Sequence, residues 1–196
     1  MIRHSSLFCK CFQIKKTSDA LYKMFMDGYD LHHEKCPYCH AKGELSFFSQ
    51  YDRQVIDLVD NEMVYHTISV QRSVCSNCRR THAILPDFLI PYCQHSIMFI
   101  LRVLWLYYTR NLSVAKLCQQ TAITPSMLYR WKKLFLLHSS LWLSTLERLG
   151  NWGQKFVLRL VDLESLSDFL HAFYLKIAIS FLQSHKNPAN CKGAPL

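Results

Sequence analysis

Hydrophobic and polar residues alternate in the first half of the chain and follow a helical period in the second half. Residues 45–51 and 54–58 are predicted strands, and residues 63–74 are predicted to form a longer strand with alternating polar and apolar positions. An Asp-Asn pair at residues 60–61 marks a turn between them. The pattern therefore predicts an antiparallel hairpin, preceded by a short capped helix over residues 20–26.

Three helices are predicted after the hairpin. Residues 95–110 are apolar nearly all round, which indicates a buried helix that is too short and too charged to span a bilayer. Ser113 can cap a second helix, and residues 119–123 form the following turn. Thr124 before Pro125 is a strong start signal for a third helix, which would bury one face made of Leu128, Trp131 and Phe135.

These elements suggest a division of the chain into five parts. Pro86 and Pro91 predict a stiff connector between the hairpin and the helices. Further helices are expected at residues 139–148 and 156–182. The predicted parts are an N-terminal helical segment (1–29), a hairpin unit with its connector (30–92), a helix-turn-helix domain (93–140), C-terminal helices (141–183) and a disordered tail (184–196). The cysteine pairs that flank the hairpin identify this unit as a zinc ribbon.

Two Cys-x-x-Cys pairs flank the predicted hairpin. Each pair, Cys36 with Cys39 and Cys75 with Cys78, can present two thiolates from one tight loop. A hairpin that joins the two loops would bring four soft ligands together in the tetrahedral arrangement of a structural zinc site. We therefore expect one structural Zn²⁺ ion, and a small α+β fold in which a zinc ribbon precedes a mainly α-helical helix-turn-helix domain.

Two other interpretations of the cysteines remain open. One of His40, His66 and His82 can replace a cysteine as a ligand. Alternatively, Cys36-Pro37-Tyr38-Cys39 has the sequence of a dithiol oxidoreductase active site. That chemistry needs the leading cysteine at a helix N-terminus after a buried strand, and residues 31–35 are not such a strand.

The positive charge of the chain is concentrated in its helical part. The formal net charge is +9, and residues 93–140 hold six basic residues and no acidic one. A surface with cations and no carboxylates attracts polyanions. Two arginines of the hairpin, Arg53 and Arg72, are also expected to point out to solvent.

The third predicted helix has the character of a DNA-reading helix. It would enter the major groove with the residues of its first turns at the base edges and with lysines on phosphates. Arg79 and Arg80, just after the second cysteine pair, are well placed for further phosphates. The residues expected to contact DNA are Arg79, Arg80, Arg110, Lys116, Thr124, Ser126, Tyr129, Arg130, Lys132 and Lys133.

The sequence from Thr124 to Lys133 resembles the recognition helix of homeodomain-like helix-turn-helix domains in bacterial transposases and resolvase-like proteins. Residues 36 to about 135 resemble the N-terminal zinc ribbon and helix-turn-helix of insertion-sequence transposases, and more closely a family of short uncharacterised bacterial proteins. One departure is Ala122, where glycine is usual in the turn; a left-handed alanine costs about 1 kcal/mol.

We therefore expect a zinc-containing DNA-binding protein, transposase-like or regulatory, that is not an enzyme. A transposase of the ribonuclease H-like kind needs three converging carboxylates, and after the predicted helix-turn-helix only Glu147, Asp162, Glu164 and Asp168 remain. The alternative is an interaction module that assembles with a separately encoded transposase or with itself. Nine cysteines and no apolar leader favour the cytoplasm, without membrane contact.

Overall fold

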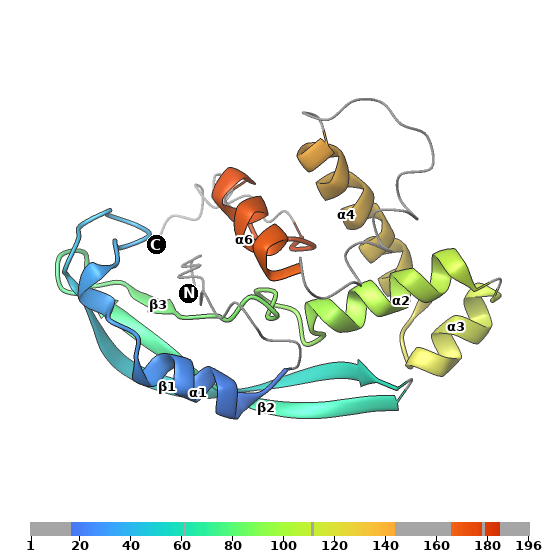
Figure 1. Ribbon diagram of the computed structural model, residues 1–196, viewed down its shortest axis with the longest axis horizontal. Helices are drawn as coiled ribbons and strands as arrows, with labels where there is room; N and C mark the ends of the chain where they lie inside the picture. Colours follow the sequence, from blue (N-terminus) through green and yellow to red (C-terminus); the bar gives the residue numbers. More distant parts are fainter. Residues whose placement is uncertain (1–16, 61, 111, 144–165, 178, 185–196) are drawn as a thin grey trace, which may run out of the picture.

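The computed structural model describes residues 17–60, 62–110, 112–143, 166–177 and 179–184 of the chain, and it has an α+β architecture, as predicted (Figure 1). A three-stranded antiparallel sheet runs along one side, and the helices lie along it and beyond one end. In chain order the elements are α1 (Asp19–Asp27), the short 3₁₀-helix η1 (Leu31–His33), β1 (Leu45–Val59), β2 (Glu62–Cys75), β3 (Thr81–Ala83), α2 (Ile97–Thr109), α3 (Val114–Thr121), α4 (Pro125–Leu143) and α6 (Leu166–Ile177).

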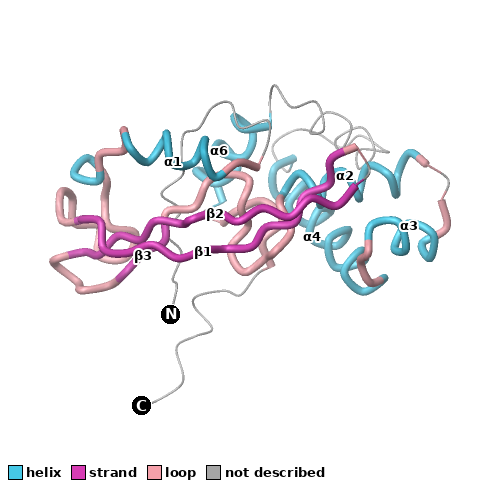
Figure 2. The backbone as a smooth tube through the Cα atoms, turned by 90° about the horizontal axis from the view of Figure 1, so that it is seen from below, coloured by secondary structure: helices cyan, strands magenta, loops and turns pink. Residues whose placement is uncertain are grey.

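The strands β1 and β2 form one long antiparallel hairpin whose register runs from Leu45 opposite Cys75 to Val59 opposite Glu62. Figure 2 shows the two strands side by side along the molecule, with the hairpin turn near α2. Cys75, the first cysteine of the second pair, ends β2 at the other end of the hairpin. A bulge interrupts the register between Phe47 and Ser49. β1 has 15 residues, so at about 3.3 Å per residue the hairpin is roughly 50 Å long.

The observed sheet differs from the predicted one in two respects. Residues 45–51 and 54–58 belong to a single strand, because the backbone of residues 51–54 pairs with β2 without a break and no turn forms. The prediction that Arg53 points to solvent is wrong: its Nη2 donates to the backbone carbonyls of Ile90 and Cys93, both at 2.6 Å. The third strand, β3, was not predicted, since three residues are too few to show alternation.

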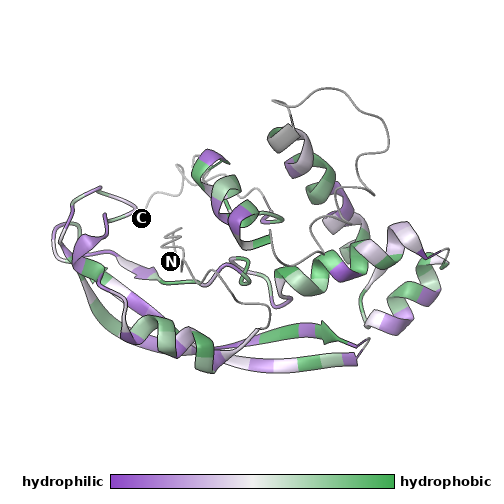
Figure 3. Cartoon of the chain, viewed as in Figure 1, coloured by the Kyte–Doolittle hydropathy of each residue, from purple (hydrophilic) through white to green (hydrophobic). Residues whose placement is uncertain are grey.

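The predicted connector is part of the hydrophobic core. Residues 82–86 and 88–90 are buried, and residues 83–85 and 88–90 belong to the same cluster of buried side chains as α2. Figure 3 shows that α2 is hydrophobic over most of its length, and it buries residues on all sides: Ile97, Met98, Phe99, Ile100, Leu101, Val103, Leu104 and Leu106. The core therefore runs without a break from the hairpin into the helices.

Helices α3 and α4 begin where their caps predict. The Ser113 hydroxyl accepts from the Lys116 N–H at 3.3 Å, and the Thr124 hydroxyl accepts from the Met127 N–H at 3.2 Å. Ala122 between the helices adopts the left-handed conformation, with φ 47° and ψ 39°. The predicted helix at residues 139–148 is confirmed for residues 139–143, which are the last residues of α4, because α4 has no proline or glycine after its first turn.

A buried carboxylate joins the hairpin to the helices and to the segment before α1. The Asp57 side chain is 5% exposed, and its oxygens accept from the hydroxyls of Thr17 at 2.6 Å and Ser96 at 3.0 Å and from the Leu58 N–H at 2.8 Å. Ser96 is also the N-cap of α2, since its hydroxyl accepts from the Phe99 N–H. One side chain thus holds three segments together.

The substitution Asp57→Ala should lower the free energy of unfolding by about 2–3 kcal/mol, because it leaves buried donors without an acceptor. Urea denaturation monitored by circular dichroism measures this loss. Asp52→Ala is the matched control: Asp52 lies on the same strand but is exposed, and its loss should change stability by less than about 0.5 kcal/mol. Equal effects of the two substitutions would contradict the role assigned to Asp57.

In the part of the chain that the structure describes, each helix is too short or too polar to cross a membrane. The predictions for residues 1–16, 144–165 and 185–196, which include most of the predicted C-terminal helices and tail, lie outside the described residues.

Candidate functional site

The two Cys-x-x-Cys pairs lie in loops with the same backbone hydrogen bonds. The Cys36 carbonyl accepts from the His40 N–H at 2.9 Å, and the Cys75 carbonyl accepts from the Arg79 N–H at 2.8 Å. His40 and Arg79 both adopt left-handed conformations, with φ 61° and 59°. Such a conformation costs a non-glycine residue about 1–2 kcal/mol, so its occurrence at the same position of both loops indicates that the loops share one architecture.

The backbone of each loop also points N–H groups at sulfur. The Cys36 thiol sulfur accepts from the N–H groups of Tyr38 and Cys39, and the Cys75 sulfur accepts from those of Asn77 and Cys78. N–H groups directed at sulfur stabilise a thiolate, which is the form that binds metals. These N–H groups therefore offset part of the cost of burial that a thiolate would have at Cys36 and Cys75.

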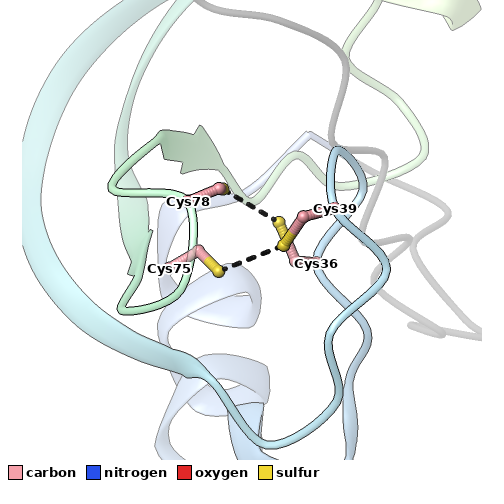
Figure 4. A group of neighbouring side chains, drawn as sticks. All are labelled: Cys36, Cys39, Cys75 and Cys78. Carbon is pink, nitrogen blue, oxygen red and sulfur yellow. Dashed lines mark hydrogen bonds between the residues drawn. The ribbon is translucent and has the colours of Figure 1, made fainter.

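The four thiols converge from the two loops, as Figure 4 shows. The sulfur atoms of Cys36 and Cys78 are 3.7 Å apart, those of Cys39 and Cys75 are 3.6 Å apart, and all four lie within 4.8 Å of one another. Four sulfur atoms about 2.3 Å from a central ion lie about 3.8 Å apart at the corners of a tetrahedron. The cluster thus has the size of a four-thiolate metal site, and these cysteines can hold a metal ion.

The environment of the cysteines differs between the core side and the solvent side of the cluster. Cys36 and Cys75 are fully buried, whereas Cys39 and Cys78 are half-buried. Burial raises the pKa of Cys36 to about 12. A hydrogen bond from the Ala41 N–H lowers the pKa of Cys39 to about 6. The cluster is therefore closed towards the core and accessible from one side.

Two further side chains contact the sulfur atoms. The Nε2 atom of the buried His82 on β3 lies 3.4 Å from the Cys36 sulfur, and the Asn77 amide donates to the Cys39 sulfur at 3.4 Å. His82, one of the predicted alternative ligands, is thus a neighbour of a complete four-cysteine cluster. The contact of Asn77 with the cluster was not predicted. Its position between Cys75 and Cys78 is a sequence signal that could have indicated it.

The first cysteine pair lies in a turn that no helix follows. The helix N-terminus that would activate Cys36 as a dithiol nucleophile is therefore not present at this loop.

The predicted DNA-contacting residues lie in two groups at opposite ends of the hairpin (Figure 1). Arg79 and Arg80 are in the loop between β2 and β3 at the cysteine end. The other eight are at the helical end: Arg110 after α2, Lys116 on α3, Thr124 before α4, and Ser126, Tyr129, Arg130, Lys132 and Lys133 on α4. The sequence alone did not indicate that the two groups lie far apart. Their separation depends on the length of the continuous hairpin, which only the structure shows.

The first turns of α4 have one buried and one exposed face. Leu128, Trp131 and Phe135 are at most 2% exposed, as predicted. The opposite face exposes Thr124, Ser126, Tyr129, Arg130 and Lys133. The exposed face thus carries two cations and three hydroxyl groups next to one another.

Three of the predicted cationic contacts have aromatic partners. Lys132 is half-buried, and its Nζ donates to the Tyr107 hydroxyl at 2.9 Å. The Arg110 guanidinium lies 5.6 Å from the centre of the Trp105 ring, and the Arg80 guanidinium lies 3.3 Å from the centre of the Tyr38 ring. Lys132 is therefore tied to α2, which makes it a poorer candidate for a phosphate contact than the exposed Lys133.

Residues 36–131 match a protein family described as a domain of unknown function (DUF6431). The match begins at the first cysteine of the cluster and ends in α4, so it includes both cysteine pairs, the hairpin, α2 and α3. No curated protein and no solved structure matches the chain. The family match therefore spans the cysteine cluster, α2 and α3, and it assigns no activity to them.

Proposed function

We propose that this chain is a zinc-containing DNA-binding protein without a catalytic domain of its own. The observation that carries the proposal is the two-faced helix α4, which follows a left-handed turn at Ala122, buries one face and exposes Ser126, Tyr129, Arg130 and Lys133. Two helices joined in this way, with the second helix exposed, form the motif that reads the DNA major groove in many proteins.

Zinc is the proposed metal because the donor set is four thiolates. Cys₄ sites with tetrahedral geometry belong to Zn²⁺ and to iron–sulfur centres, and two Cys-x-x-Cys loops bridged by strands are typical of structural zinc. All four protein ligands would be used, which leaves no open position for a substrate. The metal would therefore hold the end of the hairpin together.

Charge supports DNA as the partner of the helical end. Residues 93–140 contain six basic residues and no acidic residue. Double-stranded DNA releases condensed counterions when lysine and arginine approach its phosphates, so such a surface gains affinity at low salt. In this proposal Arg130 reads the edge of a guanine, and Lys133 contacts a phosphate. The resemblance to transposase DNA-binding regions points to the same partner.

The substitution Arg130→Ala should weaken binding to a selected duplex about 5- to 150-fold and relax the preference at one base pair, since a bidentate contact to guanine contributes about 1–3 kcal/mol. Lys133→Ala should weaken binding to all sequences alike and reduce the salt slope by about one unit. Selection of bound sequences from random DNA provides the duplex, and titrations at several salt concentrations measure both effects.

Lys42→Ala is the control for these variants, because it removes one exposed positive charge next to the first cysteine loop, where the backbone of Lys42 pairs with that of Lys35. It should leave duplex binding unchanged. If Arg130→Ala and Lys133→Ala weaken every sequence equally, α4 does not read bases.

An interaction module is the second candidate function, and one observation favours it. Leu136 and Leu137, further along α4, are 47% and 40% exposed. Two neighbouring exposed leucines on a helix suit a protein partner, such as a separately encoded transposase or a second copy of the chain. If the folded, zinc-loaded protein fails to bind any duplex at about 50 mM salt, where phosphate contacts are strong, this second function is the better one.

A further inference from the structure

Three large aromatic side chains are exposed at the cysteine end of the hairpin. Tyr38 is 48% exposed, Phe47 51% and Phe48 59%. Neighbouring residues of a strand normally point to opposite faces, so a sheet with one buried face should bury either Phe47 or Phe48. Both are exposed because of the bulge between Phe47 and Ser49, which adds one unpaired residue and turns Phe48 away from the regular register.

Arginine guanidinium groups lie over two of these three rings. The Arg80 group is 3.3 Å from the centre of the Tyr38 ring, and the Arg72 group is 6.0 Å from the centre of the Phe48 ring. A guanidinium over an aromatic face is attracted by the ring electrons and holds the ring in one orientation. The rings are thus partly ordered before any partner arrives.

One hydrogen bond and one chain link connect the two ring–arginine pairs. Arg72 Nη2 donates to the Thr81 hydroxyl at 2.7 Å, and Thr81 directly follows Arg80 in the chain. Phe48, Arg72 and Thr81 are joined by contacts, and the Arg80–Tyr38 pair lies at the adjacent residue of the chain. We call these five residues the aromatic–arginine surface. It borders the four-cysteine cluster, since Tyr38 lies between Cys36 and Cys39.

We propose that the aromatic–arginine surface binds unpaired bases of single-stranded DNA. Proteins that hold single strands combine aromatic rings, on which successive bases stack, with cations that follow the phosphates. Both parts are present here: the rings are exposed, and residues 72–82 contain Arg72, Arg79 and Arg80 and no carboxylate. Duplex DNA cannot use the rings, because its bases are already stacked on one another.

This surface lies at the opposite end of the hairpin from α4 (Figure 1), so the proposal is independent of duplex binding by the helices. If both proposals hold, one chain would contact duplex and unpaired DNA at points separated by about the length of the hairpin, roughly 50 Å. A junction between a duplex and a single strand offers both partners.

The test uses the zinc-loaded full-length protein and a fluorescently labelled 12-nucleotide oligodeoxythymidine at about 50 mM salt. Fluorescence anisotropy should show tighter binding to this strand than to an abasic strand of equal length. Tyr38→Ala and Phe48→Ala should each weaken binding to oligodeoxythymidine about 5- to 150-fold, whereas Tyr38→Trp should retain it. Zinc content and circular dichroism show whether each variant is folded.

Tyr65→Ala is the matched control, because Tyr65 is an aromatic residue of the same hairpin that is 64% exposed, but it lies near the opposite end. It should leave binding unchanged. Equal affinity for the abasic strand, tighter binding of the corresponding RNA, or no binding of any strand would overturn the proposal. It would also fail if the double variant Arg130→Ala/Lys133→Ala lost oligodeoxythymidine binding while Tyr38→Ala kept it.

Discussion

Replacing Cys75 with serine should abolish stoichiometric zinc binding and unfold the cysteine end of the hairpin. Cys75 is fully buried and ends β2 opposite Leu45, so its sulfur joins the sheet to the loop that carries Cys36 and Cys39. Binding free energies of structural zinc in small peptides are on the order of 10–16 kcal/mol, and they stabilise the folded state directly. Loss of one thiolate from four should remove most of this contribution.

Metal analysis and thermal unfolding of the purified protein measure the effect. The wild type should contain about one zinc ion per chain and should lose stability when a strong chelator is added. Cys93→Ser is the matched control, because Cys93 is half-buried and lies away from the cluster; it should keep the full zinc content. A wild-type protein that is folded without metal, or one with a disulfide within either pair, would contradict the zinc assignment.

Local patterns were sufficient to predict the features that depend on neighbouring residues. The caps of α3 and α4 follow from Ser113 and Thr124, because a hydroxyl at the N-cap satisfies backbone N–H groups of the first turn. The left-handed turn at Ala122, by contrast, was suggested only by the resemblance to helix-turn-helix domains, in which glycine is usual at this position. The four cysteines could be found because their spacing within each pair is itself the signal.

Features that depend on distant partners could not be predicted in this way. The sequence pattern predicted that Arg53 points to solvent. Its guanidinium instead donates hydrogen bonds to the carbonyls of Ile90 and Cys93, 37 and 40 residues away. An arginine at this position of the alternating pattern would point to solvent if those two carbonyls lay elsewhere. Burial lowers the pKa of the Arg53 guanidinium, and the two carbonyl bonds compensate for the lost hydration.

The position of each cation relative to aromatic rings was also beyond sequence analysis. Lys132 and Lys133 are adjacent and chemically identical, but only Lys132 meets the Tyr107 hydroxyl. Which of two neighbouring lysines faces α2 depends on the rotation of α4 about its axis. That rotation is set by the packing of Trp131 and Phe135, so the structure was needed to separate a tethered lysine from a free one.

Replacing Trp131 with alanine should lower the free energy of unfolding by about 3–5 kcal/mol, the usual loss for a buried large aromatic side chain. Trp131 is 2% exposed, and its ring packs edge-on against His95 at 5.1 Å and Phe99 at 6.0 Å between ring centres. It thereby joins α4 to the start of α2, and the alanine variant would leave a cavity at this contact. Urea denaturation gives the free energy, and Trp131→Phe should lose less because it refills part of the space.

Comparing Trp131 with its neighbour Arg130 distinguishes a packing helix from a DNA-binding helix. Arg130 is exposed on the opposite face of α4, so Arg130→Ala should change stability by less than about 0.5 kcal/mol while it weakens duplex binding. Trp131→Phe should do the reverse, with lowered stability and near-normal duplex binding at temperatures where the protein is folded. If instead both substitutions lowered stability and neither changed duplex binding, α4 would be a packing helix, and the interaction module would be the better description of the protein.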